Sequence, residues 1–178
     1  ENGYVKACTI DSWLVYKLTG GKIFATDTSN ASRTQLFNIE TLQYDDDLLK
    51  IFNIPKIMLP EVKNSSDYYG ETNLFSCGPI KIMGVAGDQQ SALLGHQLIK
   101  KGGIKMTYGT GLFCLMNTGN NPVYSENGLL TTIGLTTKNE KYYALEGSVF
   151  IGGAAVQWLR DGLNLVENAA ETEEKAFF

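Results

Sequence analysis

The sequence predicts an α/β fold, and two observations point to it. Apolar residues at 80–86 lead through a glycine turn into a helical pattern over residues 88–99, which together make a strand, a turn and a helix. After residue 103 the sequence changes to short apolar segments separated by turns, which is typical of an antiparallel meander. Its four strands are expected at residues 104–108, 112–117, 129–135 and 142–145.

The composition is that of a soluble globular protein. Of the 178 residues, 43% are hydrophobic and 19% are charged, with a net charge of −4 and a pI near 5.0. This acidic balance, with Lys and Arg scattered, argues against binding to nucleic acid or to an anionic membrane. No apolar run approaches the roughly 18 residues that a membrane span requires. The chain begins with neither Met nor a signal-peptide pattern, so we expect it to start within a longer protein.

Cysteine and histidine are too few for several kinds of site. Cys8, Cys77 and Cys114 are widely spaced, which fits free thiols in a reducing compartment and therefore a cytoplasmic protein. His96 is the only histidine, so a zinc site of Cys and His ligands is excluded, as is a Ser-His-Asp triad through any other histidine. His96 itself is expected to be a structural or surface residue.

Helical patterns lie on both sides of the predicted strands. Residues 10–18 form an expected amphipathic helix that ends at two glycines, and Trp13 on its apolar side is expected in the core. Near the other end, an apolar stripe over residues 155–166 predicts a helix that begins after Gly152 and Gly153.

The segment between the first helix and the loop that contains Pro55 and Pro60 is expected to be irregular. Short strands are expected at residues 23–25 and 36–39, and the polar residues 26–34 predict a turn with a short helix. Arg33, in this segment, either binds an anion or makes an ordinary structural hydrogen bond. Three carboxylates at 45–47 begin a further helix, where they either cap its positive end or hold a metal ion.

Asp88 stands at the turn between the predicted strand and the helix of residues 88–99. A carboxylate at a helix N-terminus is electrostatically favoured, so Asp88 either only caps the helix or faces a ligand there. Gly84 and Gly87 lack a Cβ atom, which would let a ligand approach the backbone.

Two further glycine turns could hold phosphate. Residues 109–111, Gly-Thr-Gly, lie between two predicted strands and form either a plain hairpin turn or one that offers N–H groups and a hydroxyl to phosphate oxygens. Gly152 and Gly153 precede a helix and serve either an anion or close helix packing. Neither a Walker loop nor a Rossmann fingerprint is present. The three turns together suit phosphoryl transfer, with Asp88 facing the phosphate.

These motifs resemble those of a known family. Seven segments resemble, in their residues and in their order, those of the glycerol kinase branch of the FGGY carbohydrate kinases. The resemblance extends over about residues 9–165, roughly the middle third of a full-length member. The segments are residues 9–14, 30–34, 84–93, 107–111, 125–133, 144–150 and 152–161.

The resemblance implies an actin-like, ribonuclease-H-like α/β fold. Residues 1–101 would be the C-terminal part of the first domain and residues 102–178 the N-terminal part of the second, with the glycines after Lys101 at the boundary. It implies ATP-dependent phosphorylation of glycerol to glycerol 3-phosphate, with Mg²⁺ on the phosphates, in a homo-oligomeric full-length enzyme. By motif match, Asp88 is the catalytic base and also contacts glycerol, as do Gln89 and Phe113; the ATP contacts are Gly109, Thr110, Gly153 and Gln157.

Some expectations remain open. Residues 76–79 carry no Arg where bacterial members bind the inhibitor fructose 1,6-bisphosphate, so that inhibition is not expected. The alternatives are a sibling kinase of a pentulose or another polyol, and an actin- or chaperone-like ATPase. Because parts of both ligand sites lie outside the sequence, the 178-residue chain alone is expected to be inactive.

Overall fold

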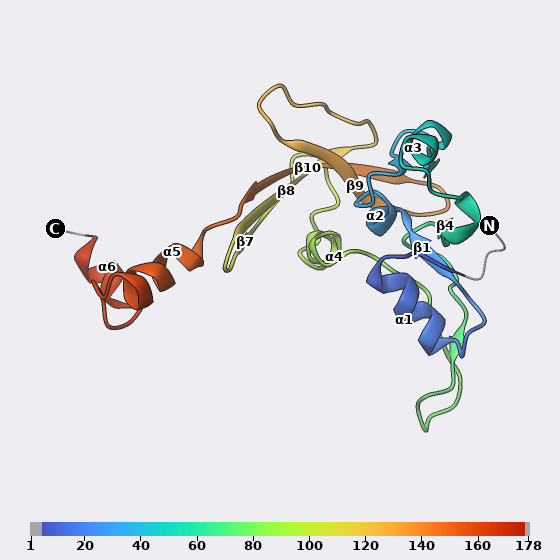
Figure 1. Ribbon diagram of the computed structural model, residues 1–178, viewed down its shortest axis with the longest axis horizontal. Coiled ribbons are helices and arrows are strands. Elements are labelled where there is room, and N and C mark those ends of the chain that lie inside the picture. Colours follow the sequence, from blue (N-terminus) through green and yellow to red (C-terminus); the bar gives the residue numbers. More distant parts are fainter. Residues whose placement is uncertain (1–4, 177–178) are drawn as a thin grey trace.

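The computed structural model describes residues 5–176 and consists of three successive parts (Figure 1). Short helices and strand pairs form the N-terminal part, a four-stranded antiparallel sheet follows, and a helical segment extends from the far end of that sheet. No helix among the described residues is long and apolar enough to cross a membrane.

Helix α1 (Ile10–Leu18) forms where it was expected and ends at two glycines with positive φ, Gly20 and Gly21. The prediction that Trp13 is a core residue is wrong, because its side chain is 50% exposed. The helix instead packs through Val15, which lies in a small cluster with Ala25 and Tyr69. The wide apolar stripe of this helix therefore faces outward in the described residues.

The next elements are short and are built around polar side chains. Strand β1 (Ala25–Asp27) pairs in parallel with β4 (Glu61–Lys63), two residues later than the expected strand at 23–25. Helix α2 (Thr28–Ala31) follows at once, as expected, because the Asp27 carboxylate accepts hydrogen bonds from the N–H groups of Ser29 and Asn30, both at 2.9 Å.

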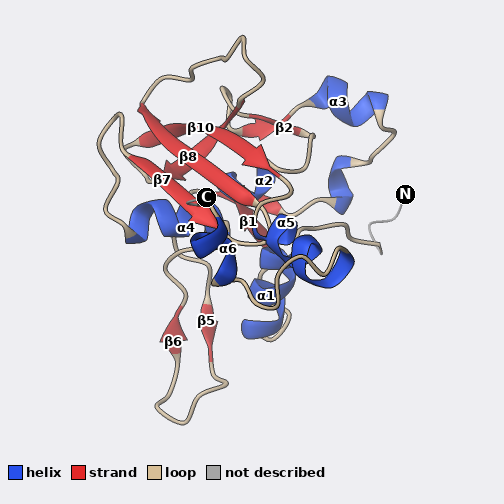
Figure 2. Ribbon diagram, turned by 90° about the vertical axis from the view of Figure 1, so that its left-hand side faces the viewer, coloured by secondary structure: helices blue, strands red, loops and turns tan. Residues whose placement is uncertain are grey.

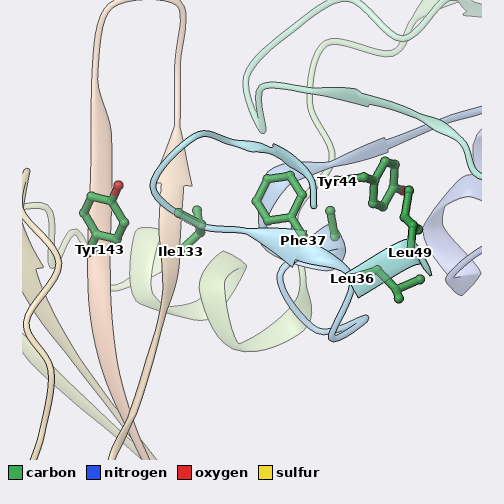
Figure 3. Close-up of a cluster of buried hydrophobic side chains, with 7 residues drawn as sticks. Leu36, Phe37, Tyr44, Leu49, Ile133 and Tyr143 are labelled. Atoms are coloured by element: carbon green, nitrogen blue, oxygen red, sulfur yellow. The ribbon is translucent and has the colours of Figure 1, made fainter. Parts of the chain in front are cut away.

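The rest of the N-terminal part surrounds a hydrophobic cluster that reaches the sheet (Figure 3). Strands β2 (Phe37–Asn38) and β3 (Gln43–Tyr44) pair with each other, and helix α3 (Asp46–Ile51) follows, with Asp45 as its N-cap. The cap interpretation of the acidic run is therefore confirmed. A 3₁₀ turn, η1 (Lys56–Met58), completes this part. In the cluster, Phe37 and Tyr44 from this hairpin join Ile133 and Tyr143 from the sheet.

The expected strand over residues 80–86 is much shorter in the structure. Only β6 (Ile80–Lys81) is a strand, paired with β5 (Glu71–Thr72) in a hairpin that protrudes from the molecule (Figure 2). Beyond it single hydrogen bonds, such as Val85 N to Ser65 O at 2.9 Å, hold the backbone without a continuous ladder. Helix α4 (Asp88–Gly95) starts where predicted but ends four residues early, since Gln97 has a φ of 58°.

The sheet contains the four expected strands in an unexpected order. They are β7 (Ile104–Tyr108), β8 (Leu112–Gly119), β9 (Leu130–Thr136) and β10 (Lys141–Val149). The order across the sheet is β7-β8-β10-β9, so the prediction of a meander is wrong. After β8, the long connection over residues 120–129 leads to β9, which does not pair with β8. Strand β10 lies between the two and pairs with both.

The predicted C-terminal helix is divided into two. Helix α5 (Gly153–Gln157) passes into a π-helical turn, η2 (Trp158–Gly162), in which Leu163 N donates to Trp158 O at 3.1 Å. A Cβ atom at Gly162 would lie 2.7 Å from the Trp158 ring, so glycine permits this close turn. The expected apolar stripe is only partly covered, since Trp158 and Leu163 are exposed at 59% and 44% whereas Val166 is buried. Helix α6 (Glu171–Lys175) ends the described chain.

Strand β9 is joined to the N-terminal part by a buried network of hydroxyl groups. The hydroxyls of Thr28 and Thr136 lie 2.7 Å apart, and Ser65 N donates to Thr136 Oγ1 at 3.0 Å. Ser65 Oγ donates in turn to Asp27 Oδ2 at 2.6 Å. All four side chains are buried, so these hydrogen bonds take the place of the hydrogen bonds to water that the groups lose in the interior.

We predict that Asp27→Ala lowers the free energy of unfolding of the natural full-length protein by about 3 kcal/mol, because buried donors lose their acceptor. Asp45→Ala is the matched control, since Asp45 caps α3 in the same way but is partly exposed. The free energy of unfolding should fall less for Asp45→Ala, because water can bind the helix N–H groups that lose the cap. Urea unfolding of both variants measures this, and equal losses would contradict a special role for the buried network.

Candidate active site

A cleft of about 610 Å³ lies where α1, α2 and the turn before α4 face the sheet. We call it the Asp88 cleft. It brings together Asp88, Gln89 and Phe113, the three residues that the sequence indicated for the acceptor substrate. Its lining residues are Ile10, Asp11, Leu14, Asn30, Arg33, Ala86, Gly87, Asp88, Gln89, Gln90, Phe113 and Glu146.

The turn that carries Asp88 is held from both sides. Gly87 is the N-cap of α4, and its N–H donates to Ser29 Oγ of α2 at 2.8 Å. Gln90, which is buried, donates through Nε2 to Ile133 O of β9 at 3.2 Å. A Cβ atom at Gly87 would lie 2.6 Å from Gln90 Oε1, so a larger residue here would displace the buried Gln90 amide.

Asp88 is the first residue of α4, as the sequence predicted. Since Gly87 occupies the cap position, the carboxylate of Asp88 is not the N-cap. It accepts a hydrogen bond from Gln89 N at 2.7 Å, and its side chain is exposed toward the cleft.

An ion pair joins the N-terminal part to the sheet at the wall of the cleft. Arg33 donates to both carboxylate oxygens of Glu146 on β10, at 2.8 and 3.1 Å. The Glu146 side chain is 7% exposed, whereas that of Arg33 is 43% exposed. Of the two alternatives for Arg33, the structure shows a bond to a protein carboxylate. Sequence reasoning missed Glu146, because 113 positions separate it from Arg33.

Lys105 on β7 is a second residue that the sequence analysis missed. Its Nζ donates to Gln89 Oε1, and Thr107 Oγ1 donates to the same oxygen at 3.2 Å. Burial lowers the pKa of Lys105, while the nearby carboxylates of Asp88 and Glu146 favour its charged form. Strand alternation was the available signal, because residues 105 and 107 share one face of β7.

The two glycine turns that were expected to hold phosphate lie against each other. Gly152 N donates to Thr110 O at 2.7 Å and Gly153 N to Gly109 O at 2.8 Å. A Cβ atom at Gly153 would lie 2.7 Å from Gly109 O, so close packing explains this glycine. The first N–H groups of α5 are thus used inside the protein, while Thr110 at the tip of the hairpin turn is exposed. Gln157 is exposed at the end of α5.

No carboxylate cluster accompanies these turns. Among residues 5–176 there is no group of three or more His, Cys, Asp or Glu side chains that could hold a metal ion. The three cysteines are free thiols.

Comparison with known proteins places these motifs in a family. Residues 3–95 match the N-terminal domain of the FGGY family of carbohydrate kinases, and residues 104–177 match the C-terminal domain of that family. Glycerol kinase from Pasteurella multocida is 55% identical over 175 residues, which are 97% of this chain and 35% of that protein. Glycerol kinase from Enterococcus casseliflavus is 53% identical over 178 residues, or 99% of this chain and 35% of that protein.

Solved structures agree with this comparison. Plasmodium falciparum glycerol kinase with ADP superposes with a TM-score of 0.85 at 41% identity, over 93% of this chain and 34% of that chain. A xylulose kinase from Lactobacillus acidophilus, at 24% identity and a TM-score of 0.73, shares the fold. This chain spans about 35% of the length of the curated relatives it matches. Its fold is the actin-like α/β fold expected from the sequence, and the chain belongs to the FGGY family of carbohydrate kinases.

Proposed function

We propose that the full-length protein transfers a phosphoryl group from ATP to glycerol and forms glycerol 3-phosphate. The observation that carries this proposal is the meeting of Asp88, Gln89 and Phe113 in one cleft. The names of the most similar relatives support glycerol as the acceptor, since they are glycerol kinases at 53–55% identity, whereas the sibling xylulose kinase is at 24%.

Asp88 is proposed as the general base. A carboxylate is a weak base, but phosphoryl transfer has a loose transition state in which positioning matters more than base strength. Asp88 would accept the proton of a terminal hydroxyl as its oxygen approaches the phosphorus. Gln89 would donate a hydrogen bond to a substrate oxygen, and the Phe113 ring would pack on the carbon chain.

The ATP phosphates are proposed to bind at the hairpin turn of residues 109–111. The exposed Thr110 at its tip can offer its hydroxyl and N–H, and the contacts of Gly153 with Gly109 keep the turn in place. Gln157, which is exposed at the end of α5, is proposed as another contact to ATP. Mg²⁺, when bound, would neutralise charge on the phosphates at this turn.

The remaining proposals concern organisation. We propose that residues 1–101 belong to the first kinase domain and residues 102–178 to the second, which is supported by the family matches at 3–95 and 104–177 and by Gly102, whose φ is 88°. Free thiols at all three cysteines support a reducing compartment, the cytoplasm. A homo-oligomeric full-length enzyme is proposed from the family resemblance alone.

For the catalytic base, we predict that Asp88→Asn in the full-length protein lowers kcat for glycerol roughly 10²–10⁴-fold. The KM for ATP should change little, because Asp88 lines the acceptor end. The matched control is Asp47→Asn, whose side chain is 85% exposed on α3 and pairs only with Lys50 in the described residues. A coupled assay of ADP release measures both. Near-normal turnover by Asp88→Asn would refute the base, and turnover with xylulose but not glycerol would indicate a sibling kinase.

For the nucleotide end, we predict that Gly153→Ala raises the KM for ATP about tenfold. The new methyl group would meet Gly109 O at 2.7 Å and displace the hairpin turn from α5. Gly95→Ala is the matched control, because a Cβ atom there meets nothing within 4 Å. It should leave the KM unchanged. Unchanged ATP kinetics in a folded Gly153→Ala protein would argue against this hairpin as a phosphate site.

For the chain by itself, we predict no phosphorylation of glycerol by residues 1–178. The chain covers about 35% of its relatives, and large apolar side chains face solvent in it, such as Trp13, Phe150 and Trp158. Expression of these residues, an ADP-release assay with glycerol and a thermal melt test the prediction. A cooperatively melting chain with glycerol-dependent turnover would contradict it.

A further inference from the structure

Gln89 is held by two donors that approach the same atom. Lys105 Nζ and Thr107 Oγ1 both donate to Gln89 Oε1, and both stand on one face of β7. The residue type at position 105 is unusual for its surroundings, because its side chain is only 6% exposed. A buried lysine is tolerated when its ammonium has a defined partner, and here the partner is an uncharged amide oxygen.

A carboxamide presents different groups at its two ends. The oxygen only accepts hydrogen bonds, and the nitrogen only donates them. With two donors at Oε1, the flipped orientation would turn Nε2 toward the Lys105 ammonium, which can only donate, and the Thr107 hydroxyl would have to accept instead of donating. The flip therefore loses a charge-assisted hydrogen bond and opposes like groups. Only one of the two amide orientations is compatible with Lys105.

We propose that Lys105 and Thr107 are positioning residues that fix the Gln89 amide, so that its Nε2 donors are left for an oxygen of the acceptor substrate. This inference rests on the proposed function, since it takes the Asp88 cleft as the acceptor site. Gln89 lines that cleft beside Asp88, and Phe113 lies on the same sheet face as Thr107, with which it is paired in register.

The arrangement defines the chemistry of the group that binds. Asp88, as a carboxylate, accepts a hydrogen bond, whereas a fixed Gln89 donates one. A diol satisfies both, because one hydroxyl can donate to Asp88 while a neighbouring hydroxyl oxygen accepts from Gln89. A substrate with a single hydroxyl leaves the Gln89 donors unpaired, which sites built on hydrogen bonds reject strongly.

Burial lowers the pKa of Lys105, and the carboxylates around it oppose that lowering. Glu146, on β10, is in register with Leu115, which is itself in register with Lys105, so both side chains lie on one face of the sheet. Arg33 already pairs with Glu146, and the Asp88 carboxylate also acts on Lys105. Within residues 5–176, the hydrogen-bond acceptor of the lysine ammonium is Gln89.

The test is a double-mutant cycle in the natural full-length protein, read by calorimetric titration with glycerol in the absence of nucleotide. Lys105→Met should raise the Kd for glycerol about tenfold and Thr107→Val about threefold, and Gln89→Ala should raise it at least as much as Lys105→Met. If Lys105 acts through Gln89, the double variant Gln89→Ala/Lys105→Met should bind glycerol as Gln89→Ala does. Additive effects would overturn the inference.

Controls separate positioning from folding. Lys100→Met, at an exposed position outside the cleft, should leave the Kd unchanged, and the KM for ATP should be normal in every variant. Should Lys105→Met fail to fold, Thr107→Val and Thr107→Ser carry the test, because serine keeps the hydroxyl and should restore binding. Equal binding by the valine and serine variants would overturn the role of Thr107.

The same titration distinguishes the two proposals. A natural protein that neither binds nor phosphorylates glycerol refutes the proposed function and this inference with it. A natural protein that binds glycerol, together with additive effects in the cycle, refutes only the inference.

Discussion

The contact on which the rest of the structure depends is the buried one between β9 and α2. Asp27, Thr28, Ser65 and Thr136 form a continuous set of hydrogen bonds in which each polar group has a partner. Such networks are directional, so they fix one relative placement where hydrophobic contact alone would permit several. Once β9 is fixed, its sheet partners follow: β10 brings Glu146 to Arg33, β8 brings Phe113 to the cleft, and β7 brings Lys105 to Gln89.

Charge alternates among three residues that line the Asp88 cleft and Lys105, which lies behind Gln89. Arg33, Glu146, Lys105 and Asp88 succeed one another as cation, anion, cation and anion. A buried charge is costly unless it is paired, and both largely buried members, Glu146 and Lys105, have a direct partner. Of the two exposed members, Arg33 is paired with Glu146, and Asp88 is the one that the proposed chemistry uses. A carboxylate that remains open to the cleft is free to meet a substrate hydroxyl.

The glycines of this chain serve two different purposes. At Gly153 the structure needs a backbone approach that a Cβ atom would obstruct, since Gly109 O would lie 2.7 Å away, whereas at Gly87 a Cβ atom would meet the Gln90 side chain at 2.6 Å. At residues 109–111 the glycines form a tight turn whose tip is exposed. The N–H groups of Gly152 and Gly153 donate to that turn and hold it against the start of α5.

Local patterns in the sequence determined the element types, the cap of α3, the start of α4 at Asp88 and the hairpin turn of residues 109–111, and the family motifs identified the kinase fold. These features depend on residues close together in the chain, where periodicity and turn chemistry are informative. Tertiary structure alone decided that β10 lies between β8 and β9, because strand order depends on a long connection and on partners far away in sequence. It also decided the pairing of Arg33 with Glu146 and of Lys105 with Gln89. The burial of Trp13 was also not decided by the local sequence. An apolar periodicity indicates which side of a helix can be covered, but not whether the described chain covers it.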